Sequence, residues 1–229
     1  MNALISNLIK ISMGLMLVIG TISCDEKNEP IPESIPESIL ESDIVYDTFS
    51  DNRDGKVYSY IQIGDQFWMA ENLAYKYQTG YWVYDNKENN VDTYGYLYNW
   101  ETACNVCPDG WHLASNTEYD SLINYLGGPT VAGGKMKRTG TYFWNSPNTG
   151  ANNSSGFTAI PGGSRNRVSW FDSMGEFGCF WTSSEQGEYY AWFLSLRYDS
   201  ESAGSILGIN GLDWCDRNYG RSVRCIKDY

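Results

Sequence analysis

Short runs of aromatic and β-branched residues, divided by glycine, asparagine and serine, fill most of the chain beyond residue 44 and limit what it can fold into. Four of these runs are 156–165, 179–185, 189–198 and 221–228. Such side chains favour strands, and the 23 glycines of the chain favour turns. Long stretches of strong helix formers are scarce. The pattern therefore predicts short strands with many turns, and it disfavours a helix bundle.

Two turns and one helix can be predicted within the first half of this region. The Asp-Gly and Gly-Asp pairs at 54–55 and 64–65 predict tight hairpin turns, because glycine tolerates positive φ. Ser115 and Glu118 have the spacing of a capping box, and Gly127 predicts the helix end. Apolar residues lie between them at helical spacing: Tyr119, Leu122, Ile123 and Leu126. Segment 92–104 is a less regular helical candidate, and the fold class is α+β with irregular, mostly antiparallel sheets and long loops.

The first 23 residues form a separate segment. Lys10 is their only charged residue, and the 13 residues 11–23 are uncharged and mostly apolar. As a helix they would rise about 20 Å, which is too short to span a bilayer core of roughly 30 Å. They are typical of a signal peptide. The small residues before Cys24 resemble a bacterial lipoprotein signal, although Thr21 stands where leucine is usual, so lipidation at Cys24 and ordinary secretion are both open.

Residues 24–43 predict an acidic, Pro/Ser-rich spacer with a tandem IPES repeat that offers little for a core. Acidic residues directly after the cysteine resemble a surface-export signal of Bacteroidetes-type lipoproteins. We therefore expect an exported protein, anchored by lipid in the outer membrane or at the cell surface, with one domain over 44–229. The net charge of −12 argues against nucleic acid as a partner.

Seven ordered blocks carry a family resemblance: DGKVYSYIQIGDQFWMAENL, YGYLYNW, CPDGWHLASNTEY, GGKMK, GFTAIPGGSR, WTSSE and SVRCIKD. Together they resemble the Fibrobacter succinogenes major paralogous domain over essentially all of 44–229. That family has no well-defined biochemical activity, so the resemblance implies none for this chain. Two of the blocks, CPDGWHLA and SVRC, are also similar to C-type-lectin-like folds and to the formylglycine-generating-enzyme group. The resemblance implies a C-type-lectin-like domain whose two ends meet in one sheet and whose long loops carry any site.

Five cysteines lie beyond the predicted lipidation site, and export favours disulfides. The lectin-like resemblance implies a bond between Cys107 and Cys225, from the helix start to the last strand. We expect Cys179 and Cys215 to form a second pair, which leaves Cys104 free. An odd number of cysteines requires an unpaired thiol or an intermolecular bond.

Metal and nucleophilic chemistry have little support in the sequence. Cys104 and Cys107 have the spacing of a redox or zinc motif, but Pro108 and a turn separate them from the predicted helix. His112, the only histidine, lies between two apolar residues with no recognisable nucleophile beside it. We interpret it as a structural residue that is hydrogen-bonded to the backbone.

Because carboxylates are plentiful, an enzyme stays open as an alternative hypothesis. A glycosidase needs two of them about 5–10 Å apart across a sugar, and the sequence does not place any pair among Glu71, Asp172, Glu185 and Glu188. A carboxylate-based hydrolase and an enzyme of the formylglycine-generating type are therefore secondary hypotheses, and a structural envelope lipoprotein is a third.

Two aromatic loops, 138–156 and 162–178, give the main functional hypothesis. They mix tryptophan and phenylalanine with asparagine, arginine and aspartate, and exposed aromatic rings beside planar polar groups suit glycans or protein surfaces. The alternative is that the tryptophans fill the core. We expect a binding or adhesion module without a cofactor, and a calcium requirement stays open. The candidate binding residues are Trp144, Asn145, Arg165, Trp170, Asp172 and Glu185.

Overall fold

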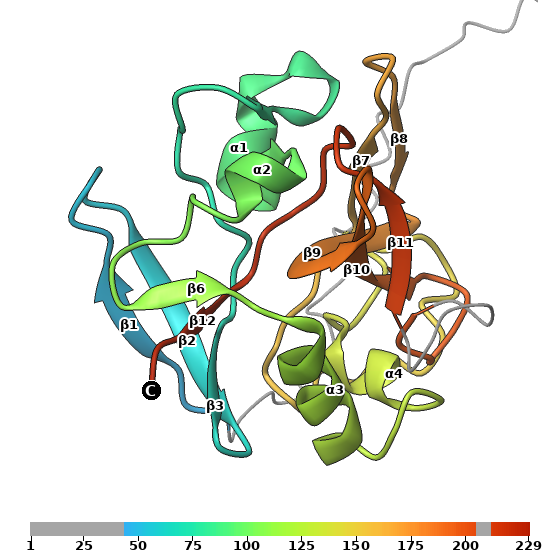
Figure 1. Ribbon diagram of the computed structural model, residues 1–229. Coiled ribbons are helices and arrows are strands. Elements are labelled where there is room, and N and C mark those ends of the chain that lie inside the picture. Colours follow the sequence, from blue (N-terminus) through green and yellow to red (C-terminus); the bar gives the residue numbers. More distant parts are fainter. Residues whose placement is uncertain (1–43, 205–211) are drawn as a thin grey trace, which may run out of the picture. The chain divides into compact units, whose positions relative to one another are not determined.

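The computed structural model describes residues 44–204 and 212–229 (Figure 1). The predicted signal peptide (1–23), the lipidation site Cys24 and the spacer (24–43) lie outside the described residues. Over the described part, no helix is both long and apolar enough to cross a membrane.

The strands of the described residues form two five-stranded sheets and one two-stranded sheet. The first sheet has the order β1 (Asp47–Ser50), β2 (Val57–Ile63), β3 (Gln66–Met69), β12 (Cys225–Lys227) and β6 (Trp111–Leu113). The second has the order β11 (Leu212–Asp216), β10 (Tyr190–Arg197), β9 (Phe177–Gln186), β7 (Gly162–Arg165) and β8 (Phe171–Met174). The third pairs β4 (Tyr81–Trp82) with β5 (Leu97–Tyr98).

Pairing is antiparallel in the first sheet, and in the second it is parallel only where β7 meets β9. Both predicted hairpins are present, but only the second has the expected tight turn. The pair at 54–55 lies in a six-residue connection, 51–56, between β1 and β2, whereas the pair at 64–65 alone joins β2 to β3, with Gly64 at φ 62°. The first and last described strands share one sheet, as the resemblance implied.

The predicted amphipathic helix is α3 (Asn116–Tyr125), and both hydrogen bonds of its capping box are present between Ser115 and Glu118. Candidate 92–104 is two separate turns of helix, because Gly95 leaves the helical region at φ 71° and β5 intervenes. The other helices are short: α1 (Val91–Tyr94), α2 (Trp100–Ala103), α4 (Ala132–Met136) and the 3-10 turns η1 (Tyr84–Asn86) and η2 (Glu88–Asn90).

The buried core lies between the two large sheets, with α3 and α4 near one end and α1 and α2 near the other (Figure 1). Its α3 side brings Tyr119 and Leu122 against Trp68 of β3 and Phe180 of β9. A second cluster joins residues of both sheets around the last strand: Tyr58, Leu113, Trp181, Val223 and Cys225. Because both sheets bury aromatic and aliphatic side chains in the same core, the stability of each sheet depends on the other.

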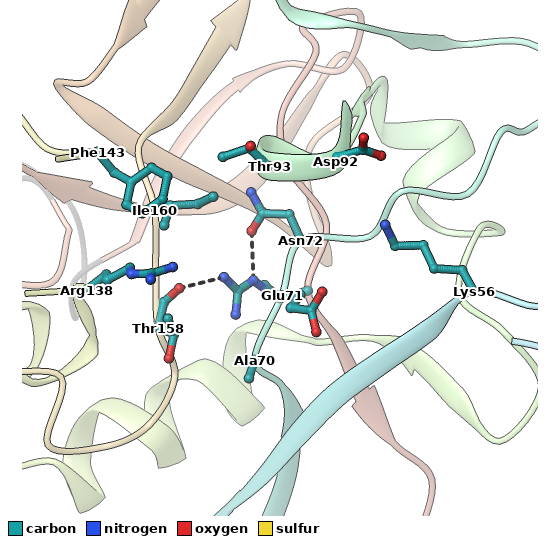
Figure 2. Close-up of a pocket in the computed structure, with 11 residues that line it drawn as sticks. Lys56, Ala70, Glu71, Asn72, Asp92, Thr93, Arg138, Phe143, Thr158 and Ile160 are labelled. Carbon is teal, nitrogen blue, oxygen red and sulfur yellow. Dashed lines mark hydrogen bonds between the residues drawn. The ribbon is translucent and has the colours of Figure 1, made fainter. Parts of the chain in front are cut away.

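Arg224, just before β12, is fully buried and makes its hydrogen bonds to neutral groups. Its guanidinium donates to the side-chain oxygen of Asn72 at 2.8 Å and to the backbone oxygen of Thr158 at 3.0 Å (Figure 2). It also donates to the backbone oxygen of Met69 at 3.0 Å and to that of Phe157 at 2.6 Å. Burial lowers the pKa of Arg224 to about 10, which leaves it charged at neutral pH. One side chain thereby joins β3 to the loop at 157–158.

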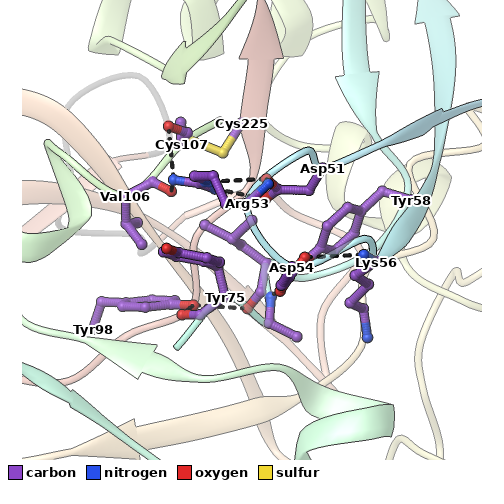
Figure 3. Close-up of polar contacts among 12 residues, drawn as sticks. Asp51, Arg53, Asp54, Lys56, Tyr58, Tyr75, Tyr98, Val106, Cys107 and Cys225 are labelled. Carbon is purple, nitrogen blue, oxygen red and sulfur yellow. Dashed lines mark hydrogen bonds and ion pairs between the residues drawn. A yellow bond between two sulfur atoms is a disulfide. The ribbon is translucent and has the colours of Figure 1, made fainter. Parts of the chain in front are cut away.

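The next residue, Cys225, forms the expected disulfide with Cys107, with their Cα atoms 5.9 Å apart (Figure 3). Arg53 attaches the β1–β2 turn to the same region: its Nη1 donates to the Val106 backbone oxygen at 2.9 Å and its Nη2 pairs with Asp51 at 2.7 Å. Burial opposes ionisation of Asp51, but the hydrogen bonds and charge of Arg53 outweigh burial and hold the pKa of this carboxyl below its usual value. The disulfide region is therefore also a hydrogen-bonded junction.

Replacing both Cys107 and Cys225 by alanine should lower the free energy of unfolding by about 4 kcal/mol, because the bond closes a loop with a sequence separation of 118 residues. Equilibrium urea unfolding measures this loss. Cys104→Ala, which removes an exposed free thiol, is the matched control and should unfold like the original protein. A double variant as stable as this control would contradict the assigned role of the bond.

Candidate functional site

Two adjoining hollows lie where β10, β11 and the β7–β8 loop approach α2. The first, of about 500 Å³, is lined from Asn99 to Glu101, from Glu188 to Tyr190 and from Asp216 to Asn218. The second, of about 490 Å³, is lined mainly by β11 and by Phe193, Tyr219 and Arg221. Arg167, Tyr190 and Asp216 line both. We call the two hollows together the aromatic groove.

Exposed aromatic rings border this groove. The β10–β11 register places Tyr190 opposite Asp216 and Trp192 opposite Trp214, so these four side chains share one face of the pair. Tyr190 is 42% and Trp214 is 53% exposed, and their rings meet edge to face with centroids 5.1 Å apart. Neighbouring Tyr189 is exposed as well. Large aromatic side chains that stay this accessible are available for a ligand.

Charged groups hold the groove in place. The Arg217 guanidinium stacks on the Trp100 ring at 4.2 Å, donates to the Gly187 backbone oxygen at 2.8 Å and pairs with Glu185 at 3.2 Å. It therefore connects the β9–β10 turn to α2. Asp216 accepts hydrogen bonds from both nitrogens of Asn218 through Oδ1, while its Oδ2 lies 3.9 Å from Arg167. Asn218 thus fixes one oxygen of Asp216, and the other oxygen forms a long ion pair with Arg167 at the groove.

The candidate residue Trp144 belongs to the core. It is only 1% exposed, and its indole nitrogen donates to the Ala159 backbone oxygen at 3.0 Å. The fully buried Lys137 ammonium lies 5.4 Å from its ring and donates to the backbone oxygens of Thr149, Arg197 and Ser200. These contacts hold loop 138–156 against β10, so the expectation that Trp144 is an exposed binding residue is wrong.

The other candidates are distributed around the β7–β8 hairpin. Trp170 is 70% exposed at its loop, whereas Arg165 stacks on Trp82 at 4.0 Å. Asp172 accepts a hydrogen bond from Ser164 at 2.7 Å, and Asn145 is exposed with its backbone nitrogen bonded to Gly175. Glu185 pairs with Arg217 beside the groove. None of these side chains lines the groove itself, although Arg167 of the same hairpin does.

The expected bond between Cys179 and Cys215 is wrong, because both thiols are free. Cys179 lies on β9 and Cys215 on β11, with β10 between them. Two strand spacings come to about 9.6 Å, which exceeds the Cα separation that a disulfide allows. Burial raises the pKa of Cys179 to about 11 and also raises that of Cys215, so neither thiol is an activated nucleophile.

The structure does not bring the candidate catalytic carboxylates or cysteines together in one site. Glu71 and Glu188 line different pockets, and Asp172 and Glu185 line neither of these. Cys107 and Cys225 are bonded to each other, so Cys104 and Cys107 do not form a dithiol pair. Among the described residues, no group of three or more histidine, cysteine, aspartate or glutamate side chains is placed to hold a metal ion.

His112 is a scaffold residue, but its partners are carboxylates and not the expected backbone groups. Its Nε2 lies 2.8 Å from Glu118 in the α3 capping box, and its Nδ1 lies 2.6 Å from Asp228 beyond β12. Burial disfavours the charged ring, but the hydrogen bonds and charges of Glu118 and Asp228 outweigh burial, so the pKa of His112 is raised. His112 thus joins the start of α3 to Asp228, just beyond β12.

Comparison with known proteins identifies one family. The family model described as the Fibrobacter succinogenes major domain matches residues 61–227. No curated protein and no solved structure matches the chain. The match confirms the resemblance in the sequence and covers the second large sheet, α3 and the aromatic groove, and the first large sheet except β1 and the start of β2.

The His112 contacts predict a pH-dependent stability. Because the folded pKa of His112 is raised above 6.5, its contribution is fully present below about pH 6.5 and is lost as pH rises through the raised value. Urea unfolding between pH 5.5 and 8.5 should therefore show the original protein losing more stability with rising pH than His112→Gln does. Parallel pH profiles for the two proteins would contradict the assignment.

Proposed function

This chain belongs to the Fibrobacter succinogenes major domain family, and we propose that it is an exported module that binds glycans through the aromatic groove. The observation that carries the proposal is the exposed pair Tyr190 and Trp214 beside Asp216 and Arg167, on the wall of two joined hollows. Sugar rings present apolar CH faces that stack on aromatic rings, and their hydroxyls bond carboxylates and guanidinium groups. The groove offers both kinds of partner within one site.

The groove is also preorganised. Arg217 is fixed by Trp100, Gly187 and Glu185, and Asp216 is fixed by Asn218. A ligand therefore meets side chains that have already lost much of their rotamer freedom, which lowers the entropic cost of binding. This favours recognition of a rigid, hydroxyl-rich ligand over a role as a purely structural envelope protein, for which such a site has no use.

We place the domain among C-type-lectin-like folds as part of this proposal. Three features support the assignment: the disulfide from Cys107 to Cys225, the presence of β1 and β12 in one sheet, and loops that display the groove. Lipidation at Cys24 after removal of 1–23, with 24–43 as a spacer, would present this domain at the outer membrane or cell surface.

A glycan array probed with the purified protein, with and without calcium, tests the proposal. We expect a restricted set of bound glycans, and the calcium arm decides whether the ion is required. Tyr190→Ala and Trp214→Ala should each weaken binding to a bound glycan by about tenfold or more, because they remove the stacking surface.

Tyr229→Ala removes an exposed tyrosine that does not line the groove and serves as the control that keeps affinity unchanged. An array without any bound glycan, or groove variants that bind as well as Tyr229→Ala, would reject glycan recognition by the groove. If the protein instead binds a surface protein and Tyr190→Ala weakens that binding, the groove recognises a protein partner and not a glycan.

A further inference from the structure

A third pocket, of about 310 Å³, lies between the start of β2, the segment after β3, helix α1 and the segment 138–160 (Figure 2). It shares no lining residue with the aromatic groove. Pockets for small molecules span roughly 300–1,000 Å³, so this one suits a ligand the size of a single sugar residue. Its occupancy does not depend on the function proposed for the groove.

Two basic side chains reach this pocket without an ionic partner. In the view of Figure 2, Arg138 and Lys56 stand on opposite sides, with Glu71 and Asn72 between them. Within residues 44–204 and 212–229, neither Arg138 nor Lys56 forms an ion pair or donates a side-chain hydrogen bond. Each lies near an aromatic ring, Arg138 at 4.6 Å from Phe143 and Lys56 at 5.5 Å from Tyr58. In a chain with a net charge of −12, two such cations facing one cavity can bind an anion.

The buried Arg224 adds a third positive charge to the lining of the pocket. All four of its hydrogen bonds go to neutral oxygens, from Asn72, Met69, Phe157 and Thr158, so no carboxylate bonded to it cancels its charge. A charge held in a poorly solvated interior acts on a nearby ligand more strongly than a solvated surface charge does. The lining of the pocket therefore contains a third positive charge besides those of Arg138 and Lys56.

The rest of the lining identifies the kind of anion. Glu71 and Asp92 also face the pocket, and Figure 2 shows Asp92 beside Thr93 at its upper edge. Their two negative charges would repel a doubly charged phosphate or sulfate, whereas three positive charges would repel a free metal cation. A ligand with a single carboxylate on a hydroxyl-bearing ring suits both the basic and the acidic lining residues. Its carboxylate pairs with a cation, and its hydroxyls donate hydrogen bonds to the carboxylates of the pocket. Phe143 and Ile160 supply an apolar wall for the face of that ring.

We propose that this pocket binds an acidic sugar residue, a uronic acid, whose carboxylate accepts a charge-assisted hydrogen bond from Arg138 on one side while a ring hydroxyl oxygen accepts one from Lys56 on the other. The hydroxyls of the sugar donate to Asp92 and Glu71, and its apolar face packs against Phe143. The two sites then recognise different chemistry: the aromatic groove takes neutral sugar faces, and this pocket takes a carboxylate-bearing residue.

Calorimetric titration of the purified protein with methyl β-glucuronide and with methyl β-glucoside tests the proposal, because the two probes differ only in the carboxylate. The glucuronide should bind and the glucoside should not, and added salt should weaken the binding. Arg138→Gln and Lys56→Gln should each lower affinity for the glucuronide by about tenfold, which is the usual loss for one charge-assisted hydrogen bond. Lys76→Gln removes an exposed lysine that does not line the pocket and should bind as the original protein does.

Equal binding of the two glycosides, no binding of the glucuronide, or unchanged affinity in both pocket variants overturns the proposal. Preferential binding of a short blocked peptide that contains glutamate also overturns it, in favour of an acidic protein partner. Matching thermal unfolding curves for all variants show that a loss of affinity is local. Tyr190→Ala should keep its affinity for the glucuronide, so failure of the groove and failure of this pocket are distinguishable.

Discussion

The fully buried guanidinium of Arg224 is the interaction on which the rest of the structure depends. A buried cation must have its donors satisfied, because each unmet hydrogen bond costs about 1–3 kcal/mol or more for a charged group. Arg224 meets this need with oxygens from two distant parts of the chain, 69–72 and 157–158. The disulfide at Cys225 fixes the same short segment to Cys107. The last strand and the residue before it therefore connect the β3 region, the segment before β6 and the loop at 157–158.

This arrangement also positions the two surfaces for which binding is proposed. The segments that Arg224 fixes, around Asn72 and Thr158, are also walls of the charged pocket. Among the described strands, β11 pairs with β10 alone and forms an edge of the second sheet. Residues of β11 line the aromatic groove. A rigid centre with varied surface loops is a common way for a scaffold to carry recognition.

Sequence reasoning succeeded where a signal is local or is carried by the family resemblance. The capping box at Ser115 and the two glycine turns are local, and the pairing of Cys107 with Cys225 came with the resemblance. It failed where the outcome depends on distant neighbours. Trp144 stands among polar loop residues, but its indole nitrogen bonds Ala159 and its ring is buried. Cys179 and Cys215 have no local feature to reveal that β10 separates them.

The aromatic groove was missed for the same reason. The run 189–193 consists of aromatic residues apart from Ala191, and no periodicity separates the exposed Tyr190 from the buried Phe193. Its partner Trp214 comes from a strand that pairs with it only in the folded chain. Likewise, Arg138, Lys56 and Asp92 are far apart in sequence, and only the fold brings them to one pocket. Pairs of exposed aromatics on adjacent strands leave a weak signal in a single sequence.

Native-state hydrogen exchange of the backbone amides tests the central role of the last strand most directly. We predict that amides of residues 223–227 exchange only through global unfolding, in the slowest class together with the central strands β9 and β10. Exchange of 223–227 through local opening, at rates like those of the exposed β7–β8 loop, would contradict it.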